Sequence, residues 1–238
     1  MANAGTRPRR QRGSITPEEI LDGAFAVARR DGLDNLSMPE LAAHLGVGVT
    51  SIYWYYRRKE DLLRKMNETA VKAIQDTLPV VEGTEASEWR SFLSNYFHSQ
   101  RKLYGADDLF TDLILIRTSS YNMPATRLVY RKLEALIDLL VRAGFELETA
   151  WHTLSTLQIY CRGFIVIERT RQANQTPPPG LLQLPLIEPE AMPHLAKLIN
   201  ERSIMLDQTG EASFDFGLNH MLDRAEQVLE REKTAKKA

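Results

Sequence analysis

The chain has 238 residues, of which 43% are hydrophobic and 26% are charged, a composition typical of an ordinary globular protein. No apolar run approaches the ~18 residues that suggest a membrane span, and no apolar stretch follows the N-terminal arginines as it would in a secretory signal, so we expect no membrane partner. The single cysteine, Cys161, excludes an internal disulfide and suits a reducing compartment, so we expect a cytoplasmic protein.

The formal net charge is only −1, but the positive charge is unevenly distributed. Residues 1–14 form a basic tail that contains Arg7, Arg9, Arg10 and Arg12 and no acidic residue. Such a tail suits an arm that meets nucleic-acid phosphates, and it equally suits a segment that only improves solubility.

Helix signals dominate from residue 16 onward, and no stretch shows the alternation of a strand. Thr16, Pro17 and Glu19 form a capping box at the start of the first helix, and Ser37 to Glu40 form a second one. The break at residues 79–86 predicts a domain boundary. We expect further helices at 37–45, 50–56, 59–78, 87–104, 107–118, 124–143, 146–172, 193–206 and 214–232.

These signals predict an all-α protein. An N-terminal three-helix helix-turn-helix domain with its linking helix is expected at 15–78, followed by a larger helical domain at 79–238.

The helix-turn-helix is expected at residues 37–56. Gly46 supplies the positive φ of the sharp turn, and the spacing of the second helix directs Ile52 and Tyr56 inward. The outward side is left with hydroxyl and aromatic groups that can contact phosphates, base edges and thymine methyls. That outward set is Thr50, Ser51, Trp54 and Tyr55. The alternative is a helical corner whose aromatic residues pack against the rest of the protein.

The run from Leu41 to Leu63, LAAHLGVGVTSIYWYYRRKEDLL, resembles the signature of the TetR (tetracycline repressor) family of bacterial regulators. The resemblance implies a homodimer that binds double-stranded operator DNA with one such domain per subunit. By position it assigns a phosphate contact to Ser37, base contacts to Val49, Thr50 and Ser51, and backbone or groove-edge contacts to Tyr53, Trp54, Tyr55 and Lys59. Val49 replaces a polar base-reading side chain of the tetracycline repressor, so the operator sequence cannot be carried over.

Residues 146–172 carry apolar side chains on more than one side, including Ile159 and Ile167 beyond the main stripe. The resemblance implies that this helix and the last one, 214–232, meet their symmetry mates in a four-helix bundle. The alternative is that both helices only fill the core of a monomer.

Aromatic residues are dense between these segments, with a few polar side chains nearby. An apolar region with a few polar groups is typical of a small-molecule site, so we expect an effector pocket here, although a solid core would account for any single aromatic residue. The candidate residues are Trp89, Phe92, Tyr96, Phe110, Arg117, Tyr121, Tyr130, Trp151, Gln158 and Arg162.

No catalytic set, cofactor loop or metal-ligand spacing is evident, so we expect neither an enzyme nor a metal or cofactor site. Cys161 fits a redox sensor less well than a small core residue. The leading hypothesis is a repressor that a small, largely apolar ligand releases from a palindromic operator. An activator or corepressor-dependent regulator of the same family, and a helical ligand carrier or enzyme, are the alternatives.

Overall fold

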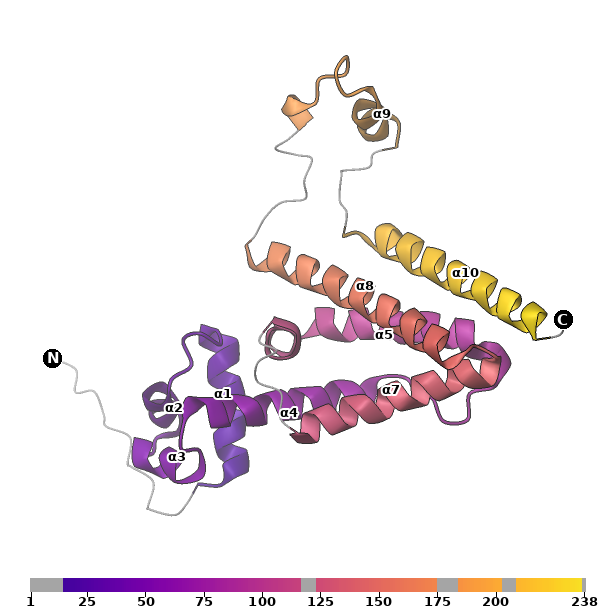
Figure 1. Ribbon diagram of the computed structural model, residues 1–238. Coiled ribbons are helices and arrows are strands. Elements are labelled where there is room, and N and C mark those ends of the chain that lie inside the picture. The colour runs from indigo at the N-terminus through magenta and orange to yellow at the C-terminus, as the bar shows by residue number, and fades with distance from the viewer. Residues whose placement is uncertain (1–14, 117–122, 175–183, 203–208, 237–238) are drawn as a thin grey trace. The chain divides into compact units, whose positions relative to one another are not determined.

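The computed structural model describes residues 15–116, 123–174, 184–202 and 209–236 (Figure 1). Regular structure in these ranges is helical throughout, which confirms the predicted all-α class. No described helix is long and apolar enough to cross a membrane. The helices are α1 Pro17–Asp31, α2 Met38–Leu45, α3 Val49–Tyr55, α4 Lys59–Thr77, α5 Trp89–Ala106, α6 Asp108–Thr111, α7 Met123–Ala143, α8 Leu147–Ala173, α9 Pro193–Arg202 and α10 Glu211–Ala235.

The chain forms two compact units. The first comprises residues 1–78 together with 106–134, and the second comprises residues 79–105 together with 135–238. The predicted boundary at residue 79 coincides with one division point, whereas residues 106–134 return to the first unit.

The first unit is built around α1 and α4. Thr16 caps α1 through the reciprocal bonds expected of a capping box, with Thr16 Oγ1 accepting from the Glu19 amide at 3.1 Å. Ile20, Leu41 and Ile52, from three successive helices, are fully buried together with Leu62 of α4. Burial of one apolar stripe from each helix therefore fixes the three-helix domain that the sequence predicts.

Two local predictions in this unit are wrong. Ser37 caps α2, but the Glu40 carboxylate bonds to Arg30 at 3.0 Å instead of completing the second capping box. The predicted single helix at 107–118 is a short α6 followed by π-helical turns at Asp112–Ile116. The buried Asn67 side chain of α4 donates to the Leu113 carbonyl at 2.7 Å, and this tertiary contact holds the widened turns in place.

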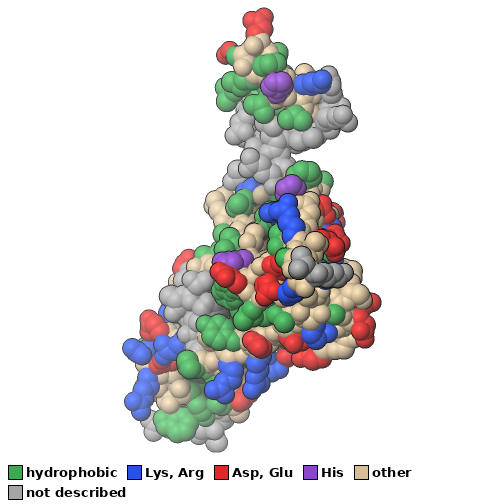
Figure 2. All heavy atoms as spheres, turned by 45° about the vertical axis from the view of Figure 1, so that its right-hand side comes forward, with side chains coloured by type: hydrophobic (Ala, Val, Ile, Leu, Met, Phe, Trp, Pro, Cys, Tyr) green, Lys and Arg blue, Asp and Glu red, His purple; other side chains and the backbone are tan. Residues whose placement is uncertain are grey.

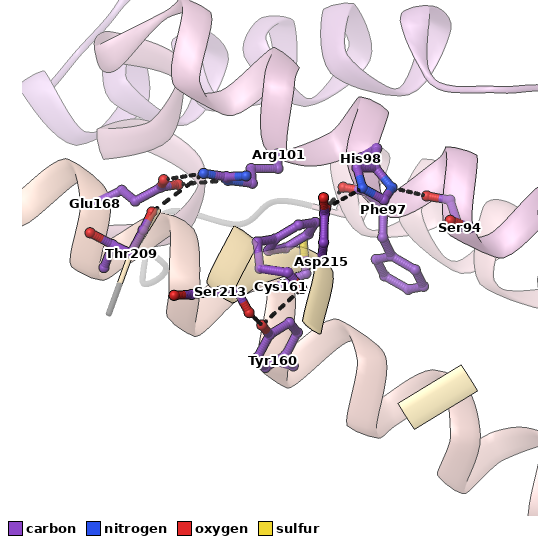
Figure 3. A network of polar contacts seen from close by, with 11 residues as sticks. Ser94, Phe97, His98, Arg101, Tyr160, Cys161, Glu168, Thr209, Ser213 and Asp215 are labelled. Carbon is purple, nitrogen blue, oxygen red and sulfur yellow. Dashed lines mark hydrogen bonds and ion pairs between the residues drawn. The ribbon is translucent and has the colours of Figure 1, made fainter. Parts of the chain in front are cut away.

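In the second unit, α5 is tied to α8 and α10 by a polar network (Figure 3). Arg101 of α5 makes two bonds to the Glu168 carboxylate, at 2.6 and 3.1 Å. Its guanidinium also lies 5.0 Å from the ring centre of Phe164 and 4.7 Å from that of Phe214. Paired bonds and flanking rings hold this arginine in one orientation.

The helices α8 and α10 run antiparallel, side by side (Figure 1). The Tyr160 hydroxyl of α8 lies 3.1 Å from the carbonyl oxygens of Ser213 and Phe214 in α10. The Tyr160 ring occupies the space that a Cβ would need at Gly217, so only glycine permits this approach.

The segment around α9 exposes several large apolar side chains among charged ones. Leu186 is 68% exposed, and Met192, Leu195 and Leu198 are each 39% exposed. Figure 2 shows green hydrophobic side chains at the top of the view, interspersed with acidic, basic and histidine side chains.

Candidate functional sites

The turn between α2 and α3 has the geometry expected of a helix-turn-helix. Gly46 adopts the left-handed conformation, with φ 67° and ψ 30°, and ends α2 as predicted. Gly48 then begins α3 in an extended conformation. A non-glycine residue at position 46 would be strained, so this glycine sets the steep change of direction between the helices.

One side of α3 is buried and the other is open. Ile52 is fully buried, whereas Trp54 is 77% exposed and Tyr53 is 44% exposed. Thr50 is also exposed, and Val49 and Ser51 are half-buried. A helix with such an open hydroxyl and aromatic face can present several base-edge and phosphate contacts at once.

Tyr55 differs from the expectation of an outward side chain. It is half-buried, and its hydroxyl donates to the Ile15 carbonyl at 2.9 Å. Ile15 is itself buried, and the Trp54 ring meets the Tyr55 ring edge-on at 4.6 Å between centres. Tyr55 thus joins the end of α3 to the chain just before α1, a partner that the α3 sequence alone does not reveal.

Tyr56 is half-buried, in keeping with its predicted inward direction. Burial raises the pKa of its hydroxyl, and the carboxylates of Glu18 and Glu68 raise the pKa further. Tyr56 therefore remains neutral and acts as a packing residue rather than as a charged contact.

Potential phosphate contacts flank the α3 face. Ser37 Oγ accepts from the Glu40 amide at 3.2 Å, which leaves the hydroxyl hydrogen available as a donor. Arg57 and Arg58 are exposed and Lys59 is half-buried at the start of α4. The basic tail at residues 1–14 lies outside the described residues.

The effector candidates fall into separate environments. In the second unit, Phe92 stacks on Tyr96 with ring centres 6.3 Å apart. Burial raises the pKa of the Tyr96 hydroxyl, and the charge of Arg162 lowers it by a smaller amount. Trp89 is buried against Phe145 at 5.0 Å. The structure thus groups part of the predicted set on α5 and α8.

The other candidates are not in this group. Phe110 packs on Phe25 in the first unit, with ring centres 5.9 Å apart, and Tyr130, also in that unit, is 65% exposed. Trp151 is 47% exposed on α8. Arg117 and Tyr121 lie outside the described residues.

Gln100 of α5 was not among the predicted residues. It is only 3% exposed, and its Oε1 atom has no hydrogen-bond partner within the described ranges. The available signal was its position, one turn after Tyr96 on the stripe that also contains Trp89, Leu93 and Phe97. A polar residue on an otherwise apolar stripe marks either a satisfied core contact or a ligand contact.

Two family models match the chain. The model for bacterial regulatory proteins of the tetR family matches residues 20–66, and the model for the tetracyclin repressor-like C-terminal domain matches residues 82–229. The chain belongs to the TetR family. It is therefore a helix-turn-helix transcription regulator, as the run from Leu41 to Leu63 predicts.

Related sequences agree with this assignment. The HTH-type transcriptional repressor Rv1353c of Mycobacterium tuberculosis is 39% identical over 234 residues, covering 97% of this chain and 88% of the relative. The class A tetracycline repressor from transposon 1721 of Escherichia coli is 25% identical over 213 residues, covering 88% of this chain and 89% of the relative.

Solved structures share the fold. ActR of Streptomyces coelicolor in complex with actinorhodin has a TM-score of 0.67 and 18% identity, covering 90% of this chain and 98% of that one. TetR from Acinetobacter baumannii AYE has a TM-score of 0.61 and 20% identity, with the same coverage.

In this TetR-family chain, Cys161 is fully buried on α8, with its Sγ 3.8 Å from the Phe97 carbonyl oxygen. Burial raises the pKa of the thiol to about 12. A neutral, inaccessible thiol is a poor nucleophile, which favours the core interpretation over a redox sensor. Among the described residues, no group of three His, Cys, Asp or Glu side chains could hold a metal ion.

The outer side of α8 and α10 carries large apolar side chains that are exposed. Ile159 and Ile167 of α8 are 74% and 54% exposed, and Phe216 of α10 is 76% exposed and stacks on His220. A groove of about 500 Å³ runs between the two helices. Its lining includes Thr149, His152, Thr156, His220, Asp223 and Gln227.

Proposed function

We propose that this TetR-family regulator is a cytoplasmic repressor that binds a palindromic operator as a homodimer, and that a small, largely apolar effector releases it. The observation that carries the proposal is the α3 helix, which buries Ile52 while it exposes Thr50, Tyr53 and Trp54. Trp54 is 77% exposed although its ring contacts Tyr55, so most of its surface remains open to DNA.

On the operator, the start of α3 enters the major groove. Val49, Thr50 and Ser51 face base edges, with Val49 limited to apolar contact such as a thymine methyl. Tyr53, Trp54 and Lys59 contact the backbone and groove edge, and Ser37 donates to a phosphate.

The experiment that tests these contacts compares the affinity for a duplex from the protein's own gene neighbourhood with the affinity for random duplex. We expect Tyr53→Ala to weaken specific binding about tenfold, a loss of about 1.4 kcal/mol. Lys59→Ala should lower the slope of log affinity against log salt by about 0.9, the value for one lost phosphate contact.

Tyr130→Ala is the matched control, because Tyr130 is also an exposed tyrosine, at 65%, but lies on α7. It should bind DNA as the unaltered protein does. Loss of folding in Tyr53→Ala, or equal effects of Tyr53→Ala and Tyr130→Ala, would favour the alternative of a packed helical corner.

The second copy is proposed to cover the outer side of α8 and α10. In α8, Leu154, Leu157 and Ile165 are buried within the chain, whereas Ile159 and Ile167 face outward. A helix that is apolar on two sides is stable when both sides are covered, and a two-fold operator needs a two-fold protein.

Sedimentation of Ile159→Glu and Ile167→Glu variants tests the dimer. We expect both to shift the protein toward monomer and to lose specific DNA binding. Val80→Glu is the control, because Val80 is exposed to a similar degree, 64%, but lies outside the helices. A dimer that survives both α8 substitutions would rule out this interface.

Effector release is supported by the named complexes among the structural relatives, which bind actinorhodin or minocycline. In this chain, the partly grouped aromatic and polar residues of α5 and α8 are the proposed binding region. A ligand that binds one conformation in preference to the other shifts the equilibrium, and so changes the spacing of the two α3 helices. An effector that raises the melting temperature yet leaves operator affinity unchanged would contradict this part of the proposal.

A further inference from the structure

Four buried polar atoms in the second unit have no hydrogen-bond partner among the described residues, and one of them, Nη1 of Arg90, has an ion-pair partner in Glu226. The other three have neither kind of partner there. They are Oε1 of Gln100, Oε1 of Gln158 and Nε of Arg162. Gln100 comes from α5, is only 3% exposed, and cannot turn its amide to open solvent. Unpaired polar atoms at this depth are costly, so several in one region indicate that something else bonds to them.

These atoms lie in one neighbourhood. Cys161 of α8 meets the Phe97 carbonyl of α5, and Glu168 meets Arg101, so the two helices advance in the same direction (Figure 3). The parallel course brings the turn from Tyr96 to Gln100 level with the turns of α8 that carry Gln158 and Arg162. The charge of Arg162 lowers the pKa of both the Tyr96 hydroxyl and the Cys161 thiol against the larger effect of burial, in keeping with this placement.

No group of the described chain neutralises Arg162. Glu168, whose charge also acts on the pKa of the Cys161 thiol, is itself engaged with Arg101. Burial raises the pKa of the Tyr96 hydroxyl well above its ordinary value and that of the Cys161 thiol to about 12. Both neighbours are therefore neutral at physiological pH, and the described residues provide no counter-ion.

We propose that Arg162, Gln158 and Gln100 bind the polar end of the effector, and that this end is an anionic oxygen with a hydrogen-bond donor beside it. The inference rests on the proposed ligand response and adds the chemical class of the ligand. The Arg162 Nε can only donate, so the ligand atom that it meets must accept, and an anion also supplies the missing charge.

The glutamine oxygens can only accept, so the adjoining ligand atoms must donate. The stacked rings of Phe92 and Tyr96 provide an apolar wall for the remainder of the molecule. An aromatic carboxylate or phenolate with a neighbouring hydroxyl satisfies all of these requirements.

The test compares two probes on the full-length protein by calorimetry. The probes are 1-hydroxy-2-naphthoate and its neutral counterpart 1-hydroxy-2-naphthamide, which have the same ring frame. We expect the naphthoate to bind at least tenfold more tightly than the amide. Arg162→Met, which keeps the length of the side chain without its charge, should remove that preference.

Arg131→Met is the matched control, because Arg131 is an exposed arginine on α7 in the other unit. It should keep the full preference for the naphthoate. The proposal is overturned if the amide binds as tightly as the naphthoate, if Arg162→Met keeps the preference, or if the intact protein binds neither probe at millimolar concentration.

Melting of the ligand-free variants provides an independent measure. Because the described residues provide no partner for the Arg162 Nε atom, Arg162→Met should melt at or above the temperature of the unaltered protein. A fall of several degrees would show that the protein itself satisfies Arg162 and would overturn the proposal. Lost probe discrimination with intact operator binding rejects only the anion site, whereas absent operator binding rejects the proposed regulator.

Discussion

The candidate functional groups of the first unit lie on its surface, whereas those of the second unit lie in its interior. In the first unit, Tyr53 and Trp54 point outward from a helix whose inner residue, Ile52, is fully buried. In the second unit, Gln100 is buried and the unpaired atoms of Gln158 and Arg162 face the interior. The residues of a surface site follow from the helical spacing of side chains along one helix. The residues of an interior site depend on how several helices pack together.

This difference predicts different consequences of substitution. A change on the outer face of α3 should alter DNA affinity and leave stability almost unchanged. A change in the interior of the second unit should alter stability or ligand binding first.

The largest expected effect is that of Arg101→Met. Arg101 is paired with Glu168, with side chains only 19% and 24% exposed, and it lies between two rings. Its removal leaves a partly buried carboxylate unpaired, so we expect a loss of about 3 kcal/mol in the free energy of unfolding measured by urea denaturation.

The control for Arg101 is Lys72→Met in the first unit. Lys72 pairs with Asp76 along α4, and both side chains are more than half exposed. Such a pair contributes at most about 0.5 kcal/mol. Equal losses for Arg101→Met and Lys72→Met would refute the view that the network of Figure 3 holds the second unit together.

A smaller loss is expected for Gly217→Ala. The added methyl group collides with the Tyr160 ring, so α10 must move away from α8 at a cost of about 1–3 kcal/mol. Gly105→Ala in α5 has open space around the new Cβ and should stabilise the helix slightly. Thermal unfolding of both variants gives the comparison, and an unchanged melting temperature for Gly217→Ala would show that the helices do not meet this closely.

Tyr55→Phe tests the attachment of α3 to the start of α1. It removes the bond to the Ile15 carbonyl, so we expect a loss of about 1 kcal/mol. For Tyr53→Phe the described residues offer no hydroxyl partner, and stability should be unchanged. Urea denaturation distinguishes the two variants. An unchanged free energy of unfolding for Tyr55→Phe would favour the purely outward role that the sequence predicts for Tyr55.

The smallest expected effect concerns Cys161. Because burial raises its pKa from 9.0 to about 12, the thiolate fraction at neutral pH falls about a thousandfold. The native protein should therefore react with a disulfide reagent such as DTNB only when it unfolds, and far more slowly than the urea-unfolded protein does at the same pH. Rapid labelling of the folded protein would restore the redox interpretation.

In the first unit, the features that local sequence signals determine can be predicted almost to the residue. The Thr16 cap, the Gly46 turn and the inward direction of Ile52 all follow from rules that act within one or two turns. Tyr55 and the turns after residue 111 deviated because their partners, Ile15 and Asn67, lie 40 and 46 residues away.

The second unit was less predictable for the same reason. The aromatic density around α5 identified Tyr96 and Phe92 but also Phe110, which packs in the other unit. The sequence does not identify Gln100 as a site residue, because a lone glutamine on an apolar stripe indicates a ligand contact only if its packed neighbours leave it unpaired. Which polar groups remain unsatisfied is a property of tertiary packing, and no periodicity encodes it.

The most direct test of the account is the dependence of operator affinity on half-site spacing. Two copies of α3 related by a two-fold axis should occupy successive major grooves, about 34–36 Å or one turn of duplex apart. We expect that inserting half a turn between the half-sites of the selected palindrome abolishes specific binding, and that a single half-site binds little better than random duplex. Unchanged affinity after the insertion would contradict a dimer that reads DNA through paired α3 helices.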